Sequence, residues 1–131
     1  MPRISRSLTL NKQASPRAKV WLEIEGDYVF GHGISEILKA VERTGSIKAA
    51  AEQLGKSYRY VWAKVKETER ALGAALVQTQ VGGKDAHRSD LTALARDLVH
   101  DFDALRERVL ELVEREFQQS VQVTLERHCR R

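Results

Sequence analysis

The chain has 131 residues, 42% of them apolar and 31% charged, so it is long enough to bury the core of one domain. Twenty-two Lys and Arg against eighteen Asp and Glu give a net charge of +4, which favours a polyanionic partner. No apolar run approaches the roughly 18 residues of a membrane span, and no signal peptide is recognisable at the N-terminus. Cys129 is the single cysteine, so no disulfide can form within the chain. These features predict a cytoplasmic protein.

The first nineteen residues form a basic arm without any acidic side chain. Its cations are Arg3, Arg6, Lys12, Arg17 and Lys19. Their apolar neighbours follow neither a helical nor a strand period, so we expect a flexible segment. Such an arm is either a solvated tail or an additional contact with nucleic acid.

Residues 20–31 show the period of a strand. Val20, Leu22 and Ile24 alternate with other residues until Gly26 and Asp27 interrupt the run. We therefore expect a strand, a turn and a second short strand over 28–30, before the period becomes helical.

Two short helices follow in close succession. Apolar residues from Ile34 to Val41 fall at helical spacing, and Gly45 is expected to end this first helix. Ser46 is a suitable N-cap for a second helix, and Gly55 supplies the turn after it. The short turn predicts a steep crossing with the next helix, as in a helix-turn-helix.

The third helix is expected from its N-cap Ser57 to about Leu72. Steps of about 100° per residue place Tyr58, Val61, Trp62, Val65, Thr68, Glu69 and Leu72 on one half, and Arg59, Tyr60, Ala63, Lys66, Glu67 and Arg70 on the other. The first half is mainly apolar, and the second is mainly basic. A solvated surface is the plain interpretation, but small Ala63 between Arg59 and Lys66 suits close approach to a DNA major groove. We therefore predict a recognition helix.

A hairpin after this helix is predicted by the β-prone run 76–81, the glycine-containing turn 82–88 and the return "SDL". Its expected tip carries Lys84, His87 and Arg88, which could contact phosphate or the minor groove as a wing. The "GGK" within it lacks the spacing and following helix of a phosphate-binding loop.

Residues 92–119 predict a long helix that begins at the N-cap Thr92. Apolar residues recur at steps of four and three, namely Leu94, Leu98, Phe102, Leu105, Val109 and Leu112. The helix is longer than a small domain needs, so we expect dimerisation along this seam, with packing against the first helix as the alternative. The tail 120–131 is open between strand, continued helix and no fixed structure.

The stretches "TGSIKAAAEQLGKSYRYVWAKVKETE" and "VQTQVGGKDAHRSDLT" resemble the N-terminal DNA-binding domain of the molybdate-responsive repressor (ModE) family, which is related to the LysR-type winged helix-turn-helix domain. The resemblance runs from about Val20 to Leu112. It implies that Ser57, Tyr58 and Arg59 meet the DNA backbone or base edges, and that Trp62 anchors its helix in the core. It also implies an N-terminal strand that completes the wing sheet, and a dimer built on the long helix.

The sequence departs from that family in three places. Full-length members continue into β-barrel domains that bind molybdate or tungstate, whereas this sequence ends where those domains would begin, so we expect no binding of molybdate or another oxyanion. Residues 85–88 stand in the wing where relatives are richer in glycine, which predicts different wing contacts. Ala95 replaces a glycine of the LysR-type pattern.

No catalytic residue, metal site or cofactor is expected. The four histidines, His32, His87, His100 and His128, lack the spacing of metal ligands.

These observations predict a mainly α fold with a small β wing: a basic arm (1–19), a winged helix-turn-helix domain (20–91), a long dimerisation helix (92–119) and a tail (120–131). The expected function is that of a DNA-binding transcriptional regulator acting on double-stranded DNA as a homodimer. The expected DNA contacts are Ser46, Lys56, Ser57, Tyr58, Arg59, Tyr60, Lys64, Lys66, Arg70, Lys84, His87 and Arg88. The alternative is a winged-helix interaction module that heterodimerises with a full-length regulator.

Overall fold

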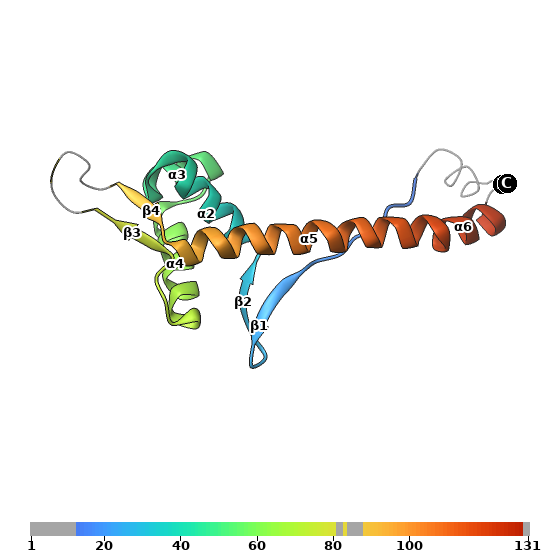
Figure 1. Cartoon of the computed structure of the whole chain (residues 1–131). Helices are drawn as coiled ribbons and strands as arrows, with labels where there is room; N and C mark the ends of the chain where they lie inside the picture. Colours follow the sequence, from blue (N-terminus) through green and yellow to red (C-terminus); the bar gives the residue numbers. More distant parts are fainter. Residues whose placement is uncertain (1–12, 81–82, 84–87, 130–131) are drawn as a thin grey trace. The chain divides into compact units, whose positions relative to one another are not determined.

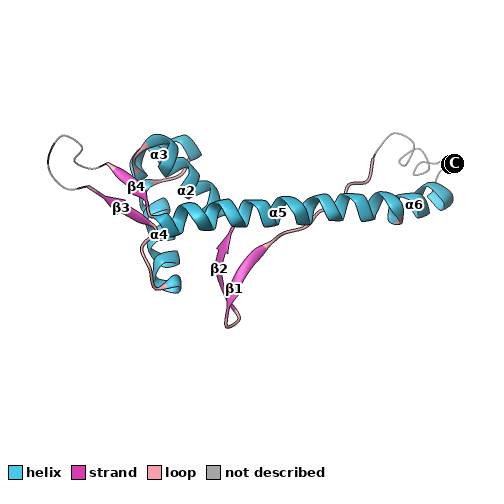
Figure 2. Cartoon of the chain, in the orientation of Figure 1, coloured by secondary structure: helices cyan, strands magenta, loops and turns pink. Residues whose placement is uncertain are grey.

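The structure, a computed structural model, describes residues 13–80, 83 and 88–129. Figures 1 and 2 show β1 Trp21–Ile24, β2 Asp27–Gly31, α2 His32–Thr44, α3 Ile47–Leu54, α4 Tyr58–Leu72, β3 Val77–Thr79, β4 Ser89–Leu91, α5 Ala93–Gln119 and α6 Val121–Cys129. The chain divides into two compact units, one of residues 20–105 and one that comprises the remainder of the chain. The predicted mainly α fold with a small β wing is confirmed.

The core of the 20–105 unit is built from β2, the three helices α2 to α4, the wing and the first turns of α5. Leu38, Val41 and Val61 are completely shielded from solvent. Phe30 of β2 meets Phe102 of α5 edge to face, with ring centroids 5.2 Å apart and an interplanar angle of 72°. Edge-to-face pairs contribute about 0.5–1.5 kcal/mol beyond their buried area, so this contact helps to fix α5 on the domain.

The helix ends predicted from the sequence are confirmed. Gly45 ends α2 in the left-handed conformation, with φ of 85°, and Gly55 ends α3 in the same way, with φ of 69°. The Ser46 side chain accepts a hydrogen bond from the Ala49 backbone N–H, and Ser57 caps α4 by the corresponding bond. Because left-handed backbone favours glycine and first-turn N–H groups need acceptors, these four residues fix both turns of the motif.

The four strands form two separate antiparallel sheets, β1 with β2 and β3 with β4. The resemblance implied that the N-terminal strand completes the wing sheet, and this expectation is wrong. β1 pairs with β2 instead, and Trp21 lies opposite Gly31. The physical reason is the tight turn between them, where Glu25 and Gly26 both have positive φ. This turn returns the chain immediately, so β1 satisfies its backbone groups with the strand that follows it.

Hydrogen bonds hold the wing at both ends of β4. The Ser89 N–H donates to the Gly45 carbonyl over 2.7 Å, and the Thr92 N–H donates to the Leu76 carbonyl over 2.9 Å. The Thr92 hydroxyl also accepts from the Ala95 N–H over 3.2 Å, which confirms Thr92 as the cap of α5. The wing, the turn before α3 and the start of α5 are thus connected.

Within the second unit, α5 runs on to Gln119 and the tail forms α6. Of the three outcomes open for the tail, the structure has the continued helix, interrupted at Ser120, whose hydroxyl donates to the Glu116 carbonyl. A helix satisfies its own backbone groups, whereas a lone strand here would need a neighbour. No helix among the described residues has both the length and the apolar character needed to cross a membrane.

Candidate nucleic-acid interface

The inner face of α4 is locked into the core. Val61 and Val65 are buried, as the helical period predicted, and so is Thr68, whose hydroxyl donates to the Lys64 carbonyl over 2.9 Å. Arg59, on the opposite side, is exposed. The helix therefore presents a polar face to solvent from a fixed position.

Trp62 does not anchor α4 in the core, so that implication of the resemblance is wrong. Its side chain is 43% exposed, and the Lys66 ammonium lies 5.8 Å from its ring centroid. One residue turns the helix by about 100°, which carries Trp62 away from the buried line through Val61 and Val65. Tyr58, which the steps of about 100° per residue also placed on the mainly apolar half, is 52% exposed.

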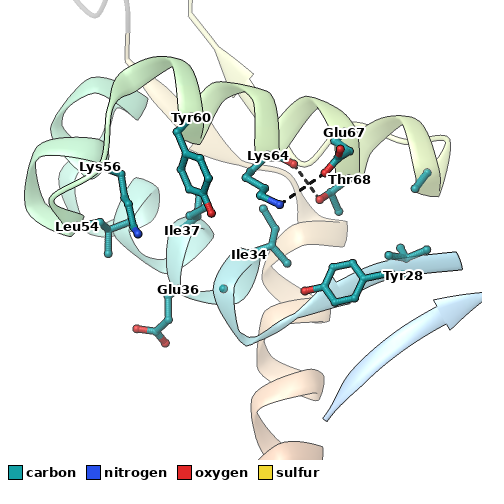
Figure 3. A pocket seen from close by; sticks show the side chains of 13 residues that line it. Tyr28, Ile34, Glu36, Ile37, Leu54, Lys56, Tyr60, Lys64, Glu67 and Thr68 are labelled. Carbon is teal, nitrogen blue, oxygen red and sulfur yellow. Dashed lines mark hydrogen bonds and ion pairs between the residues drawn. The ribbon is translucent and has the colours of Figure 1, made fainter. Parts of the chain in front are cut away.

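The exposed side of α4 divides into two rows. Tyr58, Trp62 and Lys66 form the wing-side row, which faces the wing and the start of α3. Lys56, Tyr60 and Lys64 form the hairpin-side row, which faces α2 and β2 (Figure 3). Arg59, Ala63 and Arg70 lie between the rows and are exposed. The predicted DNA contacts of this helix thus occupy three directions rather than one.

A groove of about 370 Å³ runs between the wing-side row, the start of α3 and the wing. We call it the wing groove; its lining is Ser46, Ile47, Lys48, Tyr58, Trp62, Val65, Lys66, Val77, Thr79 and Ser89. The sequence interpretation missed Lys48, Trp62 and Thr79. Trp62 could have been found from its spacing of four between Tyr58 and Lys66, but the approach of Thr79 depends on the folded wing.

Several cations of this surface have no acidic partner. Among the described residues, no carboxylate pairs with Lys48, Lys56, Arg59 or Arg70, which are exposed. Exposed cations free of local carboxylates can neutralise phosphate without first losing an ion pair.

The two lysines of α4 are paired within the helix. Lys66 lies 3.3 Å from Glu69, and Lys64 lies 3.8 Å from Glu67. Glu69 is the more constrained carboxylate, since its other oxygen accepts the backbone N–H groups of Leu76 over 2.8 Å and of the next residue over 3.1 Å. Glu69 therefore links α4 to the first wing strand, while exposed pairs such as Lys64 with Glu67 contribute little.

Both predicted cap residues keep a hydroxyl proton to donate. Ser46 and Ser57 each accept a backbone hydrogen bond through the side-chain oxygen. A hydroxyl that accepts one bond can still donate its proton, for example to a phosphate oxygen. Ser57 is exposed, whereas Ser46 is half-buried.

The structure describes part of the predicted wing. Lys84 and His87 lie outside the described residues. Arg88 directly precedes β4, on the loop side of the last strand pair Thr79–Ser89, and its carbonyl accepts the Gln80 N–H over 2.7 Å. Its guanidinium lies beside Gly45. Its Nε donates to Asp90 Oδ1 over 3.2 Å, so Arg88 would have to loosen an ion pair to bind phosphate.

The seam predicted for dimerisation is divided by the fold. Phe102 is buried and Leu98 packs against the core, so both serve the chain's own interior and Phe102 is withdrawn from the dimer surface. Leu94, Leu105 and Leu112 are exposed, and Val109 is half-buried. The seam residues that remain available to a second copy are these four.

Within the described residues, no group of three or more His, Cys, Asp or Glu side chains gathers closely enough to hold a metal ion.

Comparison with known proteins relates this geometry to DNA-binding domains. Residues 35–96 match the family described as bacterial regulatory helix-turn-helix protein, lysR family. Molybdenum transport protein ModE of Herbaspirillum seropedicae is 34% identical over 80 residues, which are 61% of this chain and 30% of that protein. Molybdenum-pterin-binding protein MopB of Rhodobacter capsulatus is 35% identical over 77 residues, or 59% of this chain and 28% of its own. The chain spans less than a third of either relative.

Solved structures show the same fold. The CbnR DNA-binding domain in complex with DNA aligns with a TM-score of 0.50 and 24% identity, covering 70% of this chain and 95% of that one. The complex of the BenM DNA-binding domain with benA site 1 DNA aligns with a TM-score of 0.51 and 17% identity, covering 67% of this chain and 93% of that one. At this identity the likeness is one of fold, and it confirms the winged helix-turn-helix architecture.

Proposed function

The chain carries a LysR-type helix-turn-helix domain over residues 35–96, and we propose that it is a transcriptional regulator that binds double-stranded DNA as a homodimer. The observation that carries this proposal is the wing groove, where the start of α3, the exposed row of α4 and the wing converge with Lys48 and Lys66 among hydroxyl groups. A helix flanked by cations and a β wing matches the requirements of groove binding. The two structural neighbours described above were solved with DNA, which agrees with it.

The N-terminal half of α4 reads bases in this proposal. Arg59 is exposed on the outermost line of the helix, and small Ala63 follows it one turn later. Arginine can bond guanine through two parallel N–H groups, and such a pair is worth about 1–3 kcal/mol of discrimination. Tyr58 and Ser57 lie at the start of the same helix, where hydroxyl groups reach phosphate.

Phosphate contacts fix the position of α4 in the groove. Ser46 and Lys48 at the start of α3, together with Lys66, supply donors on one side. Lys56, Tyr60, Lys64 and Arg70 supply donors on the remaining exposed sides of α4. Lys84, His87 and Arg88 complete the contacts from the wing, and the basic arm 1–19 adds salt-sensitive attraction.

Homodimerisation rests on the apolar residues of α5 that its own domain leaves uncovered. Leu94, Leu105 and Leu112 are exposed at helical spacing. Pairing of two such helices would bury them and present two copies of α4 to successive major grooves, about 34 Å apart. The proposal includes no catalytic residue, metal or cofactor, and it places the chain with the DNA in the bacterial cytoplasm.

Selection of binding sites from random duplex DNA by the purified chain tests the function. We expect an enriched site with two related half-sites, and affinity for it that exceeds affinity for unrelated duplex by about 10³-fold or more at physiological salt. Anisotropy titrations over a range of salt should show the linear loss of log affinity that phosphate contacts produce. Failure to retain any duplex, with retention only after a full-length regulator is added, would reject the proposal in favour of an interaction module.

A further inference from the structure

A second cavity, of about 360 Å³, lies on the other side of α4, between the hairpin-side row, the start of α2 and β2. We call it the hairpin pocket. Figure 3 shows Tyr60 and Lys64 directed from α4 toward Ile34 and Ile37 of α2, with Tyr28 approaching from β2. Sites for small molecules have volumes from about 300 Å³ and are mostly apolar with a few polar groups. The size and lining of this pocket meet that description.

The walls of the hairpin pocket combine apolar and aromatic surface. Ile34 and Ile37 are 5% exposed and form the floor with Leu54. Tyr28 and Tyr60 come from different elements and face the same space (Figure 3). Aromatic rings on either side of an aliphatic floor favour a flat apolar body, because such rings stack or meet edge to face.

Positive charge gathers at the rim. The ammonium groups of Lys56, which precedes the N-cap of α4, and of Lys64, one turn beyond Tyr60, lie 5.4 Å and 5.8 Å from the centroid of the Tyr60 ring. Two cations beside one ring lie in its favourable field but repel each other. An anion placed between them would relieve this repulsion.

The carboxylates of the pocket do not balance all of its cations. Glu36 lies 2.7 Å from the ammonium of Lys39, a residue outside the lining. Glu67 is paired with Lys64 only over 3.8 Å and is exposed. Among the described residues no carboxylate pairs with Lys56. One unbalanced cation at the mouth suits a ligand with one negative charge.

The pocket depends on a part of the chain that precedes the matched helix-turn-helix domain. Tyr28, Val29, Gly33 and Ile34 line it, and all four stand before residue 35, where the family match begins. The β1–β2 hairpin therefore adds a wall that the matched segment alone does not supply.

From these observations, we propose that the hairpin pocket binds a small aromatic carboxylate. Its rings lie on Ile34 and Ile37 between the two tyrosines, and its carboxylate lies at Lys56. Binding is non-covalent and needs no other reactant.

A regulatory consequence follows, and it rests on the proposed function. Lys56 directly precedes Ser57, the cap of α4, and Lys56 and Tyr60 are among the expected contacts with DNA. A carboxylate held at Lys56 would occupy a cation that otherwise meets phosphate and would place negative charge near the duplex. The ligand should therefore lower the affinity of the chain for DNA.

Calorimetric titration of the full chain with 2-naphthoate, in the absence of DNA, tests the pocket itself. We expect one molecule bound per chain, and binding at least tenfold weaker for the neutral 2-naphthamide, a difference of about 1.4 kcal/mol. In amide NMR spectra, the largest shifts should fall on Gly33, Ile37 and Thr68. Absence of binding at millimolar 2-naphthoate, equal binding of the amide, or shifts centred elsewhere would each overturn the proposal.

Two variants locate the site further. A Cβ atom at Gly33 would meet no atom within 4 Å, and its backbone is not left-handed, so Gly33→Leu should fill the pocket without lowering the unfolding temperature. It should abolish binding of 2-naphthoate. Lys56→Gln should weaken binding about fivefold, while Lys48→Gln, an equal loss of charge outside this pocket, should leave it unchanged. Unchanged affinity in both Gly33→Leu and Lys56→Gln contradicts the assignment.

Adding 2-naphthoate to the complex with the selected duplex separates the two proposals. We expect about fivefold weaker DNA binding by the natural chain and no change for Gly33→Leu, which cannot take up the ligand. A chain that binds 2-naphthoate but no duplex rejects the proposed function and leaves the pocket standing. A chain that binds duplex but no 2-naphthoate rejects the pocket proposal and leaves the proposed function standing.

Discussion

The ammonium of Lys39 in α2 lies 2.7 Å from the Oδ2 atom of Asp103 in α5, and the other oxygen of the same carboxylate accepts the Ser35 hydroxyl over 2.8 Å. Two residues of α2 thus hold one residue of α5 next to the buried ring of Phe102. This is the polar counterpart of the aromatic contact that attaches α5 to the domain.

This arrangement predicts a pH dependence of stability. Burial alone would raise the pKa of Asp103, but the hydrogen bonds from Lys39 and Ser35 and the nearby positive charge outweigh it and lower the pKa. The stabilisation is therefore present above the ordinary aspartate pKa of about 4 and is lost as pH falls through the lower pKa of the folded state. Asp103→Asn should cost about 1 kcal/mol at pH 7 by urea unfolding and almost nothing near pH 2.

Asp97→Asn on the same helix supplies the control, because Asp97 is exposed. It should change stability by less than about 0.5 kcal/mol at either pH. Equal effects of the two variants at pH 7 would contradict the role assigned to Asp103. The pKa of Lys39 is raised, chiefly by its hydrogen bond to Asp103, so its contribution persists until strongly alkaline pH.

The division of the α5 seam predicts opposite consequences for two of its residues. Phe102→Ala removes a buried ring and should destabilise the 20–105 unit by about 3–5 kcal/mol in denaturant unfolding. Leu112→Ala removes an exposed side chain, so it should leave that unit's stability nearly unchanged and weaken self-association in analytical ultracentrifugation. Loss of folding in Leu112→Ala, or intact folding in Phe102→Ala, would refute this division.

Base reading and phosphate binding should separate in the proposed complex. Arg59→Ala should cost about 1–3 kcal/mol on the selected duplex and relax its base preference. Lys84→Ala should weaken the binding of all duplexes similarly and reduce the slope of log affinity against log salt by about one. Competition titrations with selected and unrelated duplexes measure both effects. If the two variants altered specificity equally, these roles would be wrong.

The two turn glycines differ in what surrounds them, which gives a matched pair. Gly55→Ala faces only the cost of left-handed backbone, about 1 kcal/mol, because an added Cβ would meet no atom within 4 Å. Gly45→Ala adds a contact of 3.1 Å with the guanidinium of Arg88 and should cost more. Thermal unfolding of both variants compares them, and Arg88→Ala should reduce the excess in a double variant.

Much of the architecture could be predicted because its signals are local. Gly45, Ser46, Gly55 and Ser57 act on the residues next to them, so the helix boundaries follow from sequence. The burial of Phe102 could not be obtained in this way. Whether an aromatic side chain on a helix is covered depends on which elements pack against that face, and Phe30 of β2, which covers Phe102, lies far from it in the sequence.

The candidate site was predictable to the same extent. The periodicity of α4 identifies its buried line through Val61 and Val65, and the positive charge identifies the opposite side. The separation of that side into rows toward the wing and toward the hairpin appears only in three dimensions. Pairing of β1 with β2 likewise depends on a competition between strand partners that spacing alone does not decide.

The hydrogen bond from the Ser89 N–H to the Gly45 carbonyl fixes the start of β4 against the turn that introduces α3. In the proposed complex, a protein restrained in this way cannot easily adjust the separation between its groove-reading helix and its flanking strands. The duplex would then have to bend or narrow to fit, and sites with flexible pyrimidine–purine steps would be preferred even at base pairs that no side chain touches.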